Sequence, residues 1–403
     1  MTDPESRPEI LNMGAVGRVE TRFHTLSGPF VTQAGEEIPE VTLAYEIYGD
    51  PAPDGSNVIL VFHAITGSAH AAGYNPSVSG IGELWTEEVH RGWWDGFIGD
   101  GRAFDTSRWA VMCVNYLGGC YGSTGPRSQD PATGRPYGSR FPQITLTDIV
   151  DSQARLLDEL GYRRIHGTSG GSVGGMMAAV FAARYPDRVE VVVPIAAGFT
   201  VTTLQALHNF EQIVAILRDP GFEGGDFYDG PGPESGLALA RMIGHKTFVS
   251  LDALAERAGE EVVQREDLGG YRVVTPLESY MLHHAQKFVR RFDANTYLTI
   301  MRLWQHFDMV AELDGETMHD LLERCRHQRW QVFTIDSDVC FYPEEQMAMV
   351  NVLKAAGVPT RRYTVHSEKG HDAFLTEPHL FEALMRDAFQ GWEDRTVHDP
   401  GSL

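Results

Sequence analysis

The sequence predicts an α/β protein with a mostly parallel central sheet and a helical segment inserted into it. Short apolar runs alternate with helical patterns through the first half of the chain and again from residue 330 onward. This alternation is typical of parallel strands joined by crossover helices. Between the two stretches, over residues 201–325, the strand pattern disappears and helical periodicity replaces it.

The first half of the chain contains the runs that we expect to form most of the sheet. Five of them have the composition and length of strands: Thr42–Tyr48, Val58–His63, Trp109–Asn115, Arg163–Thr168 and Val189–Ala197. One helix is expected between the third and fourth runs, because Thr147 or Asp148 can cap its start and Gly161 can end it. A second helix is expected from Val173 until Pro186, where apolar residues recur at helical spacing.

The second half of the chain returns to the strand pattern only near its end. Helical segments are expected at 237–243, 277–288 and 298–313, and strands at Gln331–Ile335 and Arg361–Val365. We therefore predict a discontinuous α/β core of residues 1–200 and 326–395, a helical lid of residues 201–325 and a polar tail of residues 396–403. Such a lid would cover the carboxyl ends of the strands, where α/β sheets bind ligands, and would keep water away from them.

The glycine-rich run Gly170–Gly175 lies between the fourth predicted strand and the helix that follows it. A serine at such a strand-to-helix turn is exposed as a nucleophile, and the N–H groups that open the helix point toward the group that it attacks. Ser172 is therefore the predicted nucleophile of an acyl-transfer reaction. Ser169 fits the same Gly-x-Ser-x-Gly pattern and is the alternative nucleophile. A turn that serves only close helix–strand packing is the non-catalytic alternative.

A serine hydroxyl needs a histidine that removes its proton and a carboxylate that orients the histidine. His371 follows the last predicted strand and is the expected base, with His366 at the strand end as the alternative. The carboxylate is expected just after the preceding strand, where Asp338 is preferred to Asp336. The order Ser172, Asp338, His371 is the order in which such a triad occurs on α/β sheets of this kind.

An oxyanion formed at Ser172 needs two backbone N–H donors. One is expected from Val173, the residue after the nucleophile, and the other from Ile65, in the loop after the second predicted strand. His63 and His70 lie in or near this loop and are expected to structure it. We predict no metal ligand among these histidines and no metal site in the protein.

The composition argues against several classes of partner. The chain has 55 acidic and 33 basic residues, a formal net charge of −22, which argues against a nucleic-acid partner. It contains no apolar run near the roughly 18 residues of a membrane span, and its first residues lack the pattern of a secretory signal. We therefore expect a cytoplasmic protein that does not bind membranes. The four cysteines form no Cys-x-x-Cys pair and are expected to be reduced thiols.

Eight blocks of the sequence match one known family: His63–Gly67, Gly92–Gly99, Asn115–Pro126, Gly170–Gly175, Gly236–His245, Arg291–Leu298, Asp338 and Gly370–Asp372. On these blocks the chain resembles the homoserine O-acetyltransferases of methionine biosynthesis, which have the α/β-hydrolase fold. The likeness runs from about residue 40 to residue 392 and includes the predicted lid.

The resemblance implies a two-step reaction. Ser172 would take an acetyl group from acetyl-CoA, and His371 would then activate the hydroxyl of L-homoserine to attack the acyl-enzyme, with ping-pong kinetics. The resemblance also implies that Asp372 holds the amino group of the acceptor, that acetyl-CoA is a co-substrate and no cofactor stays bound, and that the protein is a homodimer joined through the lid helices. Because coenzyme A is a polyanion, this acidic chain would need a local basic patch to bind it.

The sequence departs from the family in the first predicted lid helix. The family usually has an Arg-Gln-Ala-Ile run there, whose arginine binds the carboxylate of the acceptor, whereas this chain has Ile213 at the arginine position. An apolar side chain cannot make that bidentate contact, so other groups, such as His208, Asn209 or Gln212, are the candidates to replace it. The alternatives are a carboxylesterase or thioesterase, transfer to another acceptor such as serine, a succinyl donor, and an inactive fold that only binds.

Overall fold

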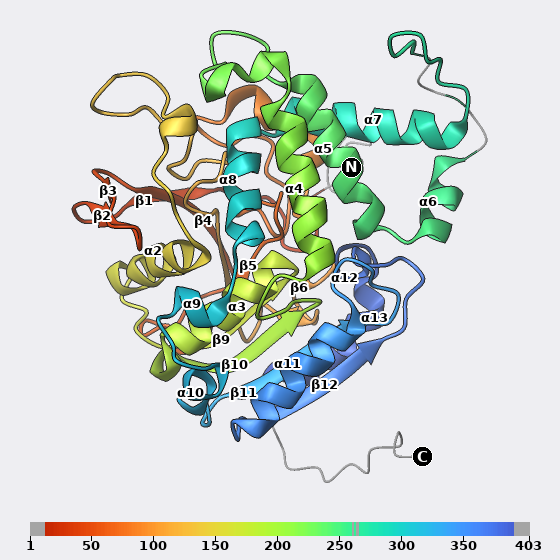
Figure 1. The fold of residues 1–403 in the computed structure, drawn as a ribbon. Helices are drawn as coiled ribbons and strands as arrows, with labels where there is room; N and C mark the ends of the chain where they lie inside the picture. Colours follow the sequence, from red (N-terminus) through yellow and green to blue (C-terminus); the bar gives the residue numbers. More distant parts are fainter. Residues whose placement is uncertain (1–12, 260–261, 263–265, 391–403) are drawn as a thin grey trace, which may run out of the picture.

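The structure, a computed structural model, describes residues 13–259, 262 and 266–390 (Figure 1). Its central sheet has eight strands in the order β1-β4-β8-β5-β9-β10-β11-β12. These strands are β1 (Arg22–Thr25), β4 (Thr42–Tyr48), β5 (Val58–Phe62), β8 (Ala110–Val114), β9 (Ile165–Gly171), β10 (Val189–Ile195), β11 (Arg329–Ile335) and β12 (Thr360–Val365). β4 pairs antiparallel with β1 and β8, and all other neighbours pair in parallel. The prediction of an α/β fold with a mostly parallel sheet is confirmed.

The predicted strand bounds agree with the structure to within two residues, except at β1 and β9. β1 was not predicted because its four residues are mostly exposed and carry no apolar pattern. β9 continues past its predicted end at Thr168 to Gly171, because it is a central strand that pairs with both β5 and β10. Its glycines are needed for packing: a Cβ at Gly171 would lie 2.3 Å from the ring of Phe374.

Helices cover both faces of the sheet. They are α2 (Leu146–Glu159), α3 (Val173–Arg184), α11 (Pro343–Ala355), α12 (Ala373–Thr376) and α13 (Pro378–Gln390). α2, α3 and α11 contribute to one apolar core, and α12 and α13 contribute to the other. The predicted cap of α2 is wrong. Thr145, and neither Thr147 nor Asp148, caps the helix, because Thr145 and Asp148 form a capping box in which each side chain accepts a hydrogen bond from the backbone N–H of the other residue.

Short elements complete this part of the fold. Two small sheets pair β2 (Phe30–Val31) with β3 (Glu37–Ile38) and β6 (Ile98–Gly99) with β7 (Phe104–Asp105), and the short 3-10 helices are η2 (Gly82–Leu84), η3 (Glu87–Val89), η4 (Gly138–Arg140), η5 (Pro186–Arg188) and η6 (Pro220–Gly225). η3 contributes Glu88 and Val89 to the wall of the cavity that Ser172 also lines.

Between β10 and β11 the described chain forms helices and no strand of the central sheet. They are α4 (Thr203–Leu217), α5 (Glu234–Phe248), α6 (Leu251–Ala258), α7 (Pro276–Arg291), α8 (Ala294–Gln305), α9 (Met309–Glu312) and α10 (Met318–Glu323). The helix predicted at 298–313 is divided between α8 and α9. The chain leaves the first helix after Gln305, and Asp308 caps the second by accepting hydrogen bonds from the N–H groups of Val310 (2.9 Å) and Ala311 (3.1 Å).

Figure 1 shows α4, α5, α7 and α8 gathered at one end of the sheet. α5 and α7 line the same cavity as the loops that follow β5 and β12, so these helices cover the carboxyl ends of the strands. The division into core, lid and tail stays a prediction. The predicted tail of residues 396–403 lies outside the described residues, as do residues 1–12 of the predicted core. No described helix is both long and apolar enough to cross a membrane.

Candidate active site

Ser172 lies at a sharp turn between β9 and α3. Its backbone has φ 61° and ψ −131°, a conformation that non-glycine residues rarely adopt and that is often found at active sites. The turn is possible because the flanking glycines let the backbones approach closely. A Cβ at Gly174 would lie 2.3 Å from the carbonyl oxygen of Phe62, and one at Gly175 would lie 2.6 Å from the Cβ of Ala197. The Gly-rich run therefore specifies the backbone geometry at Ser172.

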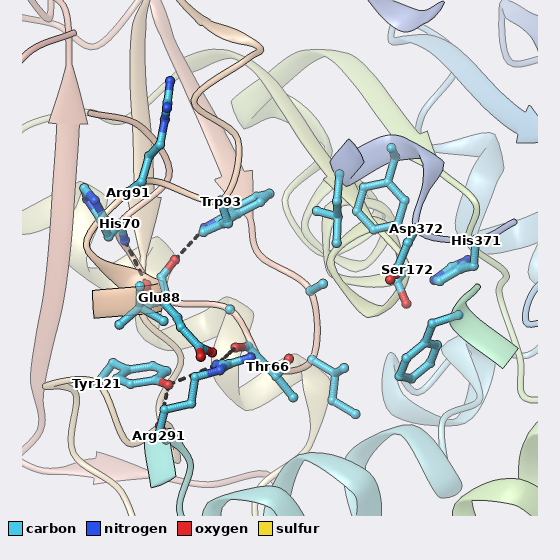
Figure 2. A pocket seen from close by; sticks show the side chains of 18 of the residues that line it. Thr66, His70, Glu88, Arg91, Trp93, Tyr121, Ser172, Arg291, His371 and Asp372 are labelled. Atoms are coloured by element: carbon cyan, nitrogen blue, oxygen red, sulfur yellow. Dashed lines mark hydrogen bonds between the residues drawn. The ribbon is translucent and has the colours of Figure 1, made fainter. Parts of the chain in front are cut away.

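The alternative nucleophile Ser169 lies inside the sheet. Its side chain is fully buried in β9, and its hydroxyl donates a hydrogen bond to the carbonyl oxygen of Val193 at 3.0 Å. Ser172, in contrast, lines a cavity (Figure 2). Of the two serines, only Ser172 is placed where a substrate can reach it.

His371 and Asp338 form a buried pair. Nδ1 of His371 lies 2.7 Å from Oδ2 of Asp338, and the two residues are 2% and 1% exposed. The other carboxylate oxygen, Oδ1, accepts hydrogen bonds from the N–H groups of Cys340 (2.8 Å) and Phe341 (2.9 Å). Because both oxygens are held, the carboxylate has one orientation, and it holds the imidazole in one orientation too.

The charge of Asp338 changes the basicity of His371. Burial by itself lowers the pKa of His371, but the charge and hydrogen bond of Asp338, with smaller contributions from Asp372 and Glu345, outweigh it and raise the pKa above 6.5. The second ring nitrogen, Nε2, is buried and has no hydrogen-bond partner among the described residues. Figure 2 shows the imidazole beside the hydroxyl of Ser172, and both residues line the cavity. Nε2 is thus available to exchange a proton with a group at this place.

The alternative acid and base pair with each other elsewhere. Nδ1 of His366 lies 2.7 Å from Oδ2 of Asp336, and Oδ1 of Asp336 accepts a hydrogen bond from the N–H of Ser367. Their side chains are 82% and 41% exposed, and neither residue lines the cavity. The described part of the chain therefore has two histidine–aspartate pairs after β11 and β12, and of these the pair of His371 and Asp338 is next to Ser172.

Of the two predicted oxyanion donors, one follows Ser172 in the chain and the other lines the same cavity. Val173 opens α3, and Ile65 lines the cavity from the loop after β5. This loop is held in place because the hydroxyl of Tyr116 donates a hydrogen bond to the carbonyl oxygen of His63 and the N–H of Gly67 donates one to Ala64 at 2.9 Å. The roles of both N–H groups in catalysis stay predictions.

Both predicted loop histidines make buried structural contacts. Burial lowers the pKa of His63 to about 3, and its ring stacks on Tyr116 with centroids 3.5 Å apart. His70 is 1% exposed and places Nδ1 2.9 Å from Oε2 of Glu46 and Nε2 3.0 Å from the carbonyl oxygen of His90. Both rings structure their loop, and the described residues contain no group of three or more His, Cys, Asp and Glu side chains that could hold a metal ion.

The cavity beside Ser172 has a volume of about 270 Å³ and contains both signs of charge. Asp372, next to His371, is one wall, and burial raises the pKa of its carboxyl. Two arginines from the helices above, Arg241 of α5 and Arg291 of α7, form another wall. The guanidinium of Arg241 lies 4.9 Å from the ring centroid of Phe288, which positions it by a cation–π contact.

Sequence reasoning missed Arg241 and Arg291 and placed the search for a cation on α4. Ile213 is 9% exposed and packs in the apolar core. His208, Asn209 and Gln212, the suggested replacements, line a separate small cavity with Cys340 and Thr247. The three suggested residues of α4 therefore lie outside the cavity of Ser172, whereas α5 and α7 bring arginines to it. Both arginines stood within matched blocks of sequence, Gly236–His245 and Arg291–Leu298, and that was the available signal.

Comparison with known proteins identifies the family. A family model described as alpha/beta hydrolase fold matches residues 57–378. The homoserine O-succinyltransferase of Alkalilimnicola ehrlichii is 40% identical over 391 residues, which cover 95% of this chain and 98% of the relative. The homoserine O-acetyltransferase of Symbiobacterium thermophilum is 40% identical over 375 residues, 92% of this chain and 94% of the relative. The chain belongs to the homoserine O-acyltransferase family.

Members of the homoserine O-acyltransferase family share their fold with hydrolases. The crystal structure of esterase E22 superposes on this chain with a TM-score of 0.82 at 25% identity. The match covers 92% of this chain and all of the esterase chain. The predicted α/β-hydrolase fold is confirmed by the family model and by the sheet order. Relatives named for a succinyl and for an acetyl donor are equally similar to this family member, so overall identity does not separate the two donors.

Proposed function

We propose that the protein transfers an acetyl group from acetyl-CoA to the hydroxyl of L-homoserine through an acyl-Ser172 intermediate. One observation carries this proposal. The cavity that holds Ser172 and His371 also holds a carboxylate, Asp372, and a guanidinium, Arg241. An amino acid presents an ammonium and a carboxylate, so these two groups are complementary to it, and its side-chain hydroxyl could then reach the acyl group.

The first step forms the acyl-enzyme. His371 Nε2 takes the proton from the hydroxyl of Ser172, and Oγ attacks the thioester carbonyl carbon. The N–H groups of Ile65 and Val173 stabilise the oxyanion that forms. The C–S bond then breaks, and the leaving thiolate takes the proton from His371. Asp338 keeps the imidazole oriented and stabilises its positive charge during this step.

The second step transfers the acyl group. The acceptor's ammonium pairs with Asp372, and its carboxylate pairs with the guanidinium of Arg241, whose planar fork suits a carboxylate. His371 Nε2 then removes the proton of the acceptor hydroxyl, whose oxygen attacks the acyl carbon in place of water. The ester bond to Ser172 breaks and Oγ recovers the proton from His371. Ping-pong kinetics follow from this scheme. The product, an O-acylated homoserine, suits methionine biosynthesis.

A hydrolase is the second candidate, because the structure of esterase E22 superposes closely on this chain. The two functions differ in what ends the reaction, an amino-acid hydroxyl or water. The test is to incubate the protein with acetyl-CoA or succinyl-CoA, with and without L-homoserine or L-serine, and to measure free CoA and the acylated product by mass spectrometry. We expect CoA release to depend on acetyl-CoA and L-homoserine together. Equal release without an acceptor would show a thioesterase, and a preference for succinyl-CoA would replace the donor.

We also propose that the protein is a homodimer joined through its lid helices. Four apolar side chains of α4 are exposed in the single chain: Leu204, Leu207, Phe210 and Leu217, at 38%, 55%, 57% and 40%. The opposite side of α4 packs on α5 and α8. An exposed apolar stripe on a helix favours burial against a second protein surface, and a second copy of the same stripe would supply it.

A further inference from the structure

One side of the active-site cavity is rich in cations, although the chain has a net charge of −22. The last turns of α7, residues 283–291, read His-His-Ala-Gln-Lys-Phe-Val-Arg-Arg and contain no acidic residue. Arg291 at the end of this segment lines the cavity, and so does Arg91 from the loop after η3. Lys287 lies one turn before Arg291 on α7 and contacts Glu88 of the cavity wall. We call Arg91, Lys287 and Arg291 the cationic rim.

The rim lies away from the reacting groups. Figure 2 shows Arg91, Glu88 and Arg291 on one side of the cavity and Ser172 and His371 on the other. Arg291 is anchored there, because its Nη1 donates hydrogen bonds to the hydroxyl of Tyr121 (3.2 Å) and the carbonyl oxygen of Thr66 (3.4 Å). The side chains of Arg91 and Lys287 are 58% and 40% exposed and so remain accessible from solvent.

The carboxylates near the rim only partly compensate it. Asp95 pairs with Arg91 at 2.8 Å, and Glu88 pairs with Lys287 at 2.7 Å. Arg291 has no carboxylate within ion-pair distance in the described part of the chain. The positive charges add to the effect of burial on the pKa of two neighbouring groups. Burial lowers the pKa of His284, and the charges of His283, Lys287 and Arg241 lower it further. Burial and the charge of Arg291 lower the pKa of Arg241 in the same way.

We propose that the cationic rim binds the phosphate groups of the acyl-CoA donor, with Lys287 as a direct phosphate ligand and Glu88 opposing it. This inference rests on the proposed function, which supplies the donor. The phosphates of coenzyme A lie at the far end of the pantetheine arm from the thioester. When the thioester reaches Ser172, the phosphates must therefore lie away from it. The solvent-accessible side of the cavity where Lys287, Arg91 and Arg291 lie provides donors of the kind that bind phosphate. A phosphate at Lys287 would displace the carboxylate of Glu88.

A second groove, which Val289 and Arg290 of α7 help to line, is the competing location. Its volume is about 980 Å³, and Arg127 and Arg290 line it together with the rings of Phe227 and Tyr228. Three carboxylates, those of Glu83, Glu234 and Asp293, also line it. Because the carboxylates outnumber the guanidiniums, this groove is less suited to a polyanion than the rim. Arg290, adjacent to Arg291 on the same helix, therefore serves as a matched control.

The test compares two thioesters in the intact protein. Acetyl-CoA carries the phosphates, and S-acetyl-N-acetylcysteamine is an acetyl thioester without them. We expect Lys287→Met to raise the KM for acetyl-CoA roughly fivefold and Glu88→Gln to lower it roughly threefold, as expected for exposed charge contacts, with kcat unchanged. Neither change should alter kinetics with the phosphate-free thioester, and Arg290→Met should alter neither donor. Added salt should raise the wild-type KM for acetyl-CoA, and should do so less in Lys287→Met.

Two outcomes would overturn the inference while the proposed function stands. If Arg290→Met raised the KM for acetyl-CoA and Lys287→Met did not, the phosphates would bind in the second groove. If Lys287→Met affected both thioesters equally, its role would not involve phosphate. If the wild-type protein turned over neither thioester but reacted at Ser172 with p-nitrophenyl acetate, the proposed function and this inference would both fail. Lys287 and Glu88 are both partly exposed, and a matching thermal melting temperature would confirm that their variants fold.

Discussion

The imidazole of His371 is held by one carboxylate and left free at its other nitrogen. Its contact with Asp338 at 2.7 Å and the absence of a partner for Nε2 among the described residues are the two features that a general base needs. The surface pair of His366 and Asp336 has the same 2.7 Å contact but does not line the cavity of Ser172. At this scale, function depends on which pair faces Ser172.

Replacing the nucleophile separates the two candidate serines. We expect Ser172→Ala to reduce acyl transfer by at least about 10³-fold, because no acyl-enzyme can form. Ser169→Ala removes a buried hydrogen bond, which costs about 1 kcal/mol of stability, but it should keep near-normal activity. Mass spectrometry of the acylated protein and thermal unfolding measure the two effects. A Ser172→Ala protein that still acquires the acyl group would refute the assignment.

The raised pKa of His371 predicts an acid limb in the pH profile. The base must be neutral to accept a proton, so kcat/KM should fall as the pH drops through the folded-state pKa, which lies above 6.5. In Asp338→Asn the residual activity, lower by about 10⁴-fold, should show its acid limb at lower pH, because burial then acts without the compensating charge. Asp336→Asn is the control and should leave the profile unchanged. An identical acid limb in Asp338→Asn would contradict this electrostatic account.

The active-site elements are held together by close backbone contacts. β9 and α3 meet at Ser172, where the glycines allow separations that any Cβ would block. The helices inserted after β10 also hold the loops of the acid and the base. The side chain of Gln205 in α4 donates a hydrogen bond to the carbonyl oxygen of Cys340 at 2.7 Å, and the N–H of Asp372 donates one to Phe248 of α5 at 2.8 Å. These helices therefore position catalytic loops besides covering them.

Gly174→Ala tests the packing at the turn. The added Cβ would lie 2.3 Å from a carbonyl oxygen of β5, and backbone cannot move aside as a side chain can. We expect a loss of roughly 3 kcal/mol in the free energy of unfolding and displacement of Ser172 from His371, with most activity lost. Denaturant unfolding and acyl-enzyme formation measure both. Gly230→Ala is the matched control, since its nearest neighbour would be 3.8 Å away. Normal stability in Gly174→Ala would contradict the packing argument.

The whole molecule brings together residues that are far apart in the chain. Ser172 comes from the first half, Asp338 and His371 from the loops after the last two strands, and Arg241 and Arg291 from the helices between them. α4, which belongs to the same inserted segment, carries the exposed apolar stripe. Dimer formation at that stripe would hold them in place and thereby stabilise the cavity below.

Phe210→Asp tests the proposed dimer. A charge at the centre of the α4 stripe cannot be buried without a partner, so we expect the variant to sediment as a monomer at concentrations where the wild type is a dimer. Val31→Asp is the control, because Val31 is 60% exposed in β2, away from the lid helices. Analytical ultracentrifugation gives the masses. A wild-type protein that sediments as a monomer at all concentrations would end the proposal.

Local patterns in the sequence are enough to predict most strands of the sheet and the turn at Ser172. Strand length, helix spacing and the glycine run act over a few residues, and the structure follows them closely at β4, β5, β8 and β10. The cap of α2 and the end of β9 were predicted wrongly, because capping depends on a specific reciprocal hydrogen bond and β9 is extended by pairing with two neighbouring strands.

The cations of the cavity could not be assigned from the sequence. Arg241 and Arg291 reach the cavity of Ser172 because α5 and α7 cross over the ends of the strands. No spacing of residues in the sequence encodes that crossing. The same holds for Ile213, which the alignment of short motifs placed at the acceptor and the structure places in the apolar core. The catalytic residues can be recognised from short motifs and from the order of these motifs along the chain. Which charges the inserted helices bring to the cavity depends on how those helices pack.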